Sequence, residues 1–171
     1  MQTFLKTLFI RSASISALAI TLSTGTADAA PVEFAALITP KADVTLRFED
    51  GSNRLVRLVQ REGETSGDAP LDGTTMLEWG MHELTSEKGS GQGYLVFTHD
   101  SGDIAYLRFD WQARMLQSPS GSLSPKLAGS WGIVGGTGRF AALKGVGSLR
   151  IEVRSARERY WVFEGDIHND T

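Results

Sequence analysis

The sequence predicts an all-β domain, an antiparallel barrel of about eight strands. Short runs of alternating apolar and polar residues recur along the chain at the spacing typical of a sandwich or barrel. No segment after the first thirty residues repeats its apolar residues at helical spacing. Seven of the nineteen glycines fall within residues 129–151, where they favour a sharp bend between two late strands.

The first 29 residues have the three-part pattern of a secretory signal peptide. Lys6 and Arg11 give a basic start, residues 13–22 are mainly apolar, and residues 27–29 form a small-x-small cleavage site. The apolar stretch is shorter than the ~20 residues of a membrane span, and the alternative interpretation is an ordinary N-terminal helix. We expect cleavage after residue 29, a periplasmic or secreted location without membrane contact, and one β-barrel domain over residues 30–171.

The composition limits the classes of partner. The chain carries 17 Lys and Arg against 20 Asp and Glu, a net charge of −3, and it contains no run of basic residues. Nucleic-acid binding needs a basic stripe on the surface and is therefore not expected. Cysteine is absent, so the fold uses no disulfide even in an oxidising compartment. The three histidines lack the spacing of metal ligands, so we expect neither a metal nor another cofactor.

The alternating runs define the expected strands. They cover residues 44–48, 54–61, 74–84, 94–98, 104–111 (with 112–117 as an extension), 127–134, 148–154 and 160–167. Residues 62–73 and 85–93 are rich in glycine and polar residues and are expected to be loops. All five prolines are expected outside the strands. The run 74–84 is apolar on both faces, which predicts one face in the core and the other in a cavity or contact.

The glycine-rich motif at residues 135–140, which reads GGTGRF, allows three interpretations. A dinucleotide-binding loop needs a following helix within a parallel sheet, whereas here a strand with alternating residues follows. A structural role is the second interpretation, because glycine permits positive φ and close backbone approach at the corner of a barrel. The third interpretation is a family resemblance.

Residues 130–140, followed by Gly145-Val146-Gly147, resemble the hallmark of allene oxide cyclases and plant dirigent proteins. The motif residues are Gly135, Gly136, Thr137, Gly138, Phe140, Gly145 and Gly147. The resemblance implies a calycin-like, eight-stranded antiparallel barrel that uses no cofactor and holds a small apolar molecule in its mouth. Allene oxide cyclases close a ring on a fatty-acid epoxide, and dirigent proteins orient phenolic radicals. We expect a secreted bacterial-type relative, and because many members form homo-oligomers, a homo-oligomer is an open alternative to a monomer.

Two strand faces carry candidate catalytic residues. Glu78 and His82 share one face of the run 74–84, and Arg108 and Asp110 share a face of the run 104–111. If these faces line the interior, they would supply an acid, a base and a cation beside an apolar pocket. The alternative is a charged row that faces solvent, because small barrels fill their interiors with apolar side chains.

Aromatic residues are the candidates for contact with a ligand. Trp79 and Tyr106 lie on the same two strands, and Trp131 precedes the glycine-rich motif. The tryptophans are otherwise expected to pack in the core or at the rim. The sequence is compatible with two functions, an isomerase or cyclase that acts on a small apolar or aromatic ligand, and a non-catalytic exported barrel that carries a ligand or has a structural role.

Overall fold

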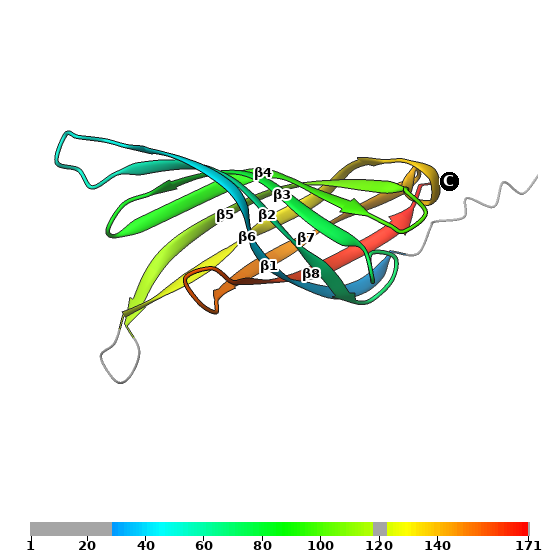
Figure 1. Ribbon diagram of the computed structural model, residues 1–171. Helices are drawn as coiled ribbons and strands as arrows, with labels where there is room; N and C mark the ends of the chain where they lie inside the picture. Colours follow the sequence, from blue (N-terminus) through cyan, green and yellow to red (C-terminus); the bar gives the residue numbers. More distant parts are fainter. Residues whose placement is uncertain (1–28, 118–122, 171) are drawn as a thin grey trace, which may run out of the picture.

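The computed structural model describes residues 29–117 and 123–170, and its strands form one closed barrel (Figure 1). Each strand is antiparallel to the next, and the last strand pairs with the first. The elements are β1 (Ala30–Arg47), β2 (Leu55–Gly67), β3 (Thr75–Leu84), β4 (Lys88–Thr98), β5 (Ile104–Gln117), β6 (Leu123–Gly136), the 3-10 turn η1 (Gly138–Phe140), β7 (Leu143–Val153) and β8 (Arg159–Asn169). The expected all-β, eight-stranded antiparallel barrel is confirmed, and the expected signal peptide lies outside the described residues.

Aromatic rings pack against one another in the interior of the barrel. Side chains of a strand alternate between its two faces, so every second residue of each strand points inward. Phe34 stacks on Phe163 with ring centroids 4.6 Å apart, and it meets Phe97 and Trp131 edge to face. Phe140 of the 3-10 turn is fully buried and covers one end of the barrel. This end is filled, and the buried charged or titratable residues Arg61, Glu78 and His82 lie toward the opposite end.

That opposite end, called the mouth here, is formed by the β1–β2, β3–β4 and β7–β8 hairpins. Figure 1 shows the β1–β2 hairpin projecting beyond the other strands at this end. Strand β1 pairs with β8 only as far as Ile38 and then continues beside β2 alone. The mouth is therefore the less tightly closed end of the barrel. Within the described part of the chain, no helix has the length and apolar character needed to cross a membrane.

Strand β1 starts well before the expected position. It begins at Ala30 rather than at Val44, so the expectation that all prolines lie outside strands is wrong. Pro31 is the second residue of β1, where a missing N–H costs little, and Pro40 lies at a register shift in the β1–β2 ladder. Pro125 lies in β6, opposite Met115. The inward alternation of apolar residues from Val32 to Ile38 outweighs the prolines that flank it.

Two segments that were expected to be loops, residues 62–73 and 85–93, are partly strand in the structure. Strand β2 continues to Gly67, because residues 62–67 pair with β1, and β4 begins at Lys88. The glycines of residues 89–93 therefore lie within a strand. Gly91 faces inward, and a Cβ there would overlap the indole ring of Trp111. Glycine in this strand makes room for a large side chain from the neighbouring strand.

The glycine-rich corner joins β6 to β7 through the three-residue turn η1. Thr137 is extended, with φ −126° and ψ 161°, and no α-helix follows it. Gly138 has φ +51°, in the left-handed region that favours glycine, and a Cβ there would overlap the Asp103 carboxylate. The antiparallel strands on both sides exclude the dinucleotide-binding interpretation, which requires a parallel sheet.

Two glycines of this corner make a matched test. Gly138→Ala is expected to lower the free energy of unfolding by about 1–2 kcal/mol, because it places a Cβ in the left-handed region. Gly135→Ala is expected to change it by less than about 0.5 kcal/mol, because no atom lies within 4 Å of a Cβ at that position. Urea unfolding of both variants measures the difference. Equal effects would contradict this role for Gly138.

Candidate functional site

A buried carboxylate lies inside the barrel on β3. Glu78 is fully buried, and its two oxygens have different partners. Oε2 accepts a hydrogen bond from Nη1 of Arg61 at 3.1 Å, and Oε1 lies 2.8 Å from Nε2 of His82. Arg61 faces Glu78 directly across the β2–β3 ladder, so the register of these strands sets the ion pair. Both carboxylate oxygens are therefore engaged, as a buried charge requires.

Gly80 allows Glu78 and His82 to meet on the same strand. The two residues are four positions apart, and the residue between them on the inner face is Gly80. A Cβ at Gly80 would lie 2.6 Å from Oε1 of Glu78 and 3.1 Å from Nε2 of His82. A side chain at this position would therefore displace the hydrogen bond. The sequence Glu-x-Gly-x-His was visible in the chain as a pattern that could have indicated this contact.

A cavity of about 180 Å³ opens at the mouth beside this cluster. Its polar side is formed by His82 with Arg57, Arg61 and Arg159. Its other side is apolar, formed by Leu84, Trp111, Ala113, Pro125, Leu127, Ile151, Val153 and Trp161. His82 meets Trp111 edge to face, with ring centroids 4.9 Å apart. Glu78 does not line the cavity, so His82 and Arg61 lie between its carboxylate and any ligand.

Arg159, at the start of β8, completes the polar side. Burial lowers the pKa of Arg159 from its ordinary value, and the charges of Arg61 and Arg57 lower it further, while Glu78 opposes them. Its Nη1 donates to the carbonyls of Ser155 at 2.7 Å and Glu158 at 2.9 Å. The guanidinium is thus held in place by main-chain acceptors in a region of positive potential.

The predicted site residues separate into two groups. Glu78 and His82 lie inside and contact each other, whereas Arg108 and Asp110 lie on the outer surface and do not reach the interior cluster. The reason is the alternation of β5, which turns its apolar residues inward and therefore turns Arg108 and Asp110 outward. Asp110 accepts a hydrogen bond from Ser130 there, at 2.6 Å.

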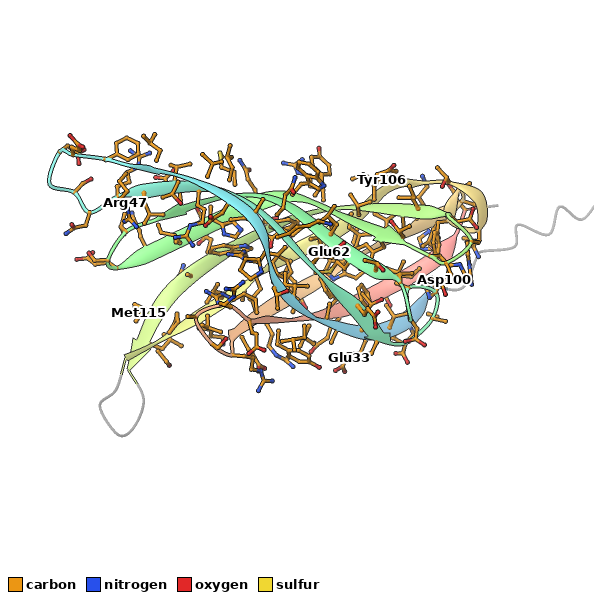
Figure 2. The ribbon with its side chains drawn as sticks, in the orientation of Figure 1. Glu33, Arg47, Glu62, Asp100, Tyr106 and Met115 are labelled. Atoms are coloured by element: carbon orange, nitrogen blue, oxygen red, sulfur yellow. The ribbon has the colours of Figure 1, made fainter. Side chains whose placement is uncertain are left out.

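The three predicted ligand contacts also separate. Trp79 is 53% exposed on the outside of β3, and Tyr106 lies on the outer face of β5 (Figure 2). Trp131 is inside and buried, but it donates to the carbonyl of Ser148 at 3.0 Å and packs against Phe34 rather than lining the mouth cavity. None of the three therefore lies at the wall of this cavity.

A larger hollow lies on the outer surface, with a volume of about 710 Å³. Trp79 and Arg108 line it together with Leu58, Met81 and Tyr94, and all five are exposed. It holds no buried titratable side chain, so its size alone does not make it a reactive site. We regard the smaller mouth cavity as the candidate site, because the buried ion pair and histidine adjoin it.

The sequence reasoning did not identify Arg61, Arg159 or Trp111 as site residues. Arg57, Val59 and Arg61 alternate in the expected strand 54–61, which was a sign that two arginines share one face. No such pattern indicates Arg159, which becomes part of the site only when β8 closes the barrel. Within residues 29–117 and 123–170, no group of three or more His, Cys, Asp or Glu side chains could hold a metal ion.

The comparisons with known proteins concern the fold. The sequence matches no protein-family model and no curated protein. A conserved protein of unknown function from Rhodopseudomonas palustris is similar in structure, with a TM-score of 0.50, 12% identity, and coverage of 82% of this chain and 99% of that chain. A protein of unknown function from Clostridium acetobutylicum has a TM-score of 0.50, 10% identity, and coverage of 83% and 99%.

A pterocarpan synthase dirigent protein is also similar, with a TM-score of 0.48, 11% identity, and coverage of 91% of this chain and 100% of that chain. At sequence identities this low, structural similarity is informative about the fold and not about the activity. The strand topology of this chain is itself the closed eight-stranded barrel that the resemblance to allene oxide cyclases and dirigent proteins implies.

Proposed function

We propose that the mouth cavity binds a small apolar or aromatic ligand and that His82 guides its isomerisation or cyclisation by moving a proton, without a cofactor. The observation that carries this proposal is a buried histidine, hydrogen-bonded to a fully buried carboxylate, at the wall of a largely apolar cavity. A titratable group held in such a place is typical of sites for acid–base chemistry. The barrel architecture is compatible with this function but does not by itself imply it.

The hydrogen bonds give each residue a distinct role. When Glu78 is ionised, its Oε1 accepts the Nε2 proton of His82, so the lone pair is on Nδ1 and can take a proton from a ligand. Glu78 then acts as a positioning residue, because it orients the ring and stabilises the imidazolium that forms. Arg61 lines the cavity and can donate to a ligand oxygen on which negative charge develops.

Two successive measurements test this function. Native mass spectrometry of the protein from its own source is expected to find a co-purifying small molecule. When this molecule is incubated with the protein in D2O, we expect deuterium incorporation or product formation that falls at least about 100-fold in His82→Gln. Arg108→Gln is the matched control on the outer surface and should leave the rate unchanged. Equal rates for wild type and His82→Gln would contradict proton transfer by His82.

The alternative is a non-catalytic exported barrel that carries a ligand or has a structural role. The exposed hollow on β1–β4 favours a contact role for that surface, because isolated apolar side chains are common but gathered ones mark interaction sites. A co-purifying molecule that is bound and never converted would support the carrier. Conversion of the co-purified molecule, measured as described above, thus separates the two functions.

Export and self-association are two further proposals, and each has its own test. We propose a periplasmic or secreted location, supported by the pattern of the first 29 residues, and N-terminal sequencing of the protein from its source should find Ala30 first. We also propose a homo-oligomer in which a second copy covers Leu58, Trp79 and Tyr94, whose side chains are more than half exposed. Sedimentation of Trp79→Ser should then show a smaller particle than the wild-type protein.

A further inference from the structure

The polar side of the mouth cavity carries more positive than negative charge. Arg61 is paired with Glu78, and Nε of Arg57 lies 3.5 Å from Oδ2 of Asp43. Arg159 forms no salt bridge with any described residue, and its Nη1 donates only to main-chain carbonyls. Three guanidinium groups therefore face two carboxylates, which leaves one positive charge without a counter-ion. A partly buried charge in this situation favours an anion close to it.

The apolar side of the same cavity includes the indole rings of Trp111 and Trp161. Trp111 and Trp161 are 3% and 1% exposed, and both line the cavity. The Nε1–H group of each is buried and has no hydrogen-bond partner among the described residues. Buried N–H groups are normally satisfied, and an indole nitrogen can only donate. These two nitrogens are too deeply buried to be reached from the cavity, so the indole rings offer a ligand apolar contact surface and Arg159 is the donor that it can reach.

We propose that the ligand of the mouth cavity is an apolar monocarboxylic acid with a single ring, bound as its anion through Arg159. This inference rests on the proposed function and specifies the ligand class of the same site. The carboxylate accepts hydrogen bonds from the Arg159 guanidinium, and the ring lies against Trp111, Trp161 and Ile151.

Volume and charge restrict the ligand to this class. A cavity of about 150 Å³ is sufficient for benzene, so a cavity of about 180 Å³ holds one ring with a short side chain. One uncompensated positive charge matches a carboxylate. A phosphate monoester carries about 1.5–2 negative charges near neutral pH and would leave excess negative charge at the site.

The experiment compares an acid with its uncharged amide. The probes are 3-phenylpropanoate and 3-phenylpropanamide, which share the same ring and chain, and calorimetry gives their affinities for the full mature chain. We expect the acid to bind at least about tenfold more tightly than the amide, and to shift the indole ¹H–¹⁵N signals of Trp111 and Trp161. In Arg159→Met, which keeps most of the apolar stem, we expect this preference for the acid to disappear. Arg159→Lys should retain part of it.

Arg150→Met is the matched control, since Arg150 is an arginine of the neighbouring strand β7 that is paired with Glu164 on the outer surface. It should bind both probes as wild type does. Equal affinity of wild type for acid and amide, or an unchanged preference in Arg159→Met, would overturn the inference. Tight binding of the amide would then still support an apolar ligand site. A preference for the acid that survives in His82→Gln, with no change in turnover, would support the anion site and contradict the catalytic proposal alone.

Discussion

Glu78→Ala is expected to lower the free energy of unfolding by about 3–5 kcal/mol, one of the two largest effects of a single substitution in this barrel. Glu78 is fully buried between Arg61 and His82, and the side chains of these partners are 9% and 6% exposed. Removal of the carboxylate leaves the guanidinium of Arg61 buried without a counter-charge, and this is what makes the loss of one partner so costly. Urea unfolding followed by tryptophan fluorescence measures the change.

The control for this prediction is an ion pair on the outer surface. Arg150 Nη1 lies 3.0 Å from Oε1 of Glu164, and both side chains are about half exposed. Glu164→Ala should therefore cost only about 0–1 kcal/mol. The double variant Arg61→Met with Glu78→Leu should recover much of the stability lost in Glu78→Ala, because it removes both charges together. A similar cost for Glu78→Ala and Glu164→Ala would contradict the role of the buried pair.

Phe34→Ala is expected to lower the free energy of unfolding by about 3–5 kcal/mol through the loss of aromatic packing. Phe34 is 1% exposed and contacts Phe97, Trp131 and Phe163, so its ring joins side chains from strands on different sides of the interior. Alanine would leave a cavity that these large, closely packed rings cannot fill. Thermal and urea unfolding should both show the loss.

Val44 provides the comparison on the same strand. Its side chain is 70% exposed on the mouth side of β1, so Val44→Ala should change the free energy of unfolding by about 0.5 kcal/mol or less. The two substitutions remove apolar atoms from one strand and differ both in burial and in the size of the side chain that is removed. If Phe34→Ala cost no more than Val44→Ala, the aromatic cluster would not be the main source of stability.

The sequence predicted where most strands lie better than it predicted which face of each strand points into the barrel. On β5 the inner face could be inferred, because Leu107 and Phe109 alternate with Arg108 and Asp110, and burial selects the more apolar face. On β3 the rule fails. Its more polar face, with Glu78 and His82, turns inward, because Arg61 on β2 supplies a counter-charge there. This partner belongs to another strand, so β3 alone does not reveal it.

The remaining differences between expectation and structure depend on whether a feature is set by local residues or by pairing with a distant strand. The early part of β1 was not predicted, because Pro31 and Pro40 normally indicate the absence of a strand, yet pairing with β2 and β8 stabilises it. The corner at Gly138 was predicted, because it depends on a local backbone angle. The position of Arg159 beside Arg61 depends on the closure of the barrel and has no local signal.

The pairing of β1 with β8 also determines when the molecule can finish folding. Phe34 lies opposite Phe163, so residues from nearly the whole length of the chain must come together at one seam. Contacts between such distant residues carry a high entropic cost and make folding slow. Before Arg159–Asn169 is synthesised, β1 and β7 are open edges of the sheet. Other chains could pair with these edges and form an aggregate. The last eleven-residue strand therefore protects the first, and deletion of this strand should harm solubility more than its length suggests.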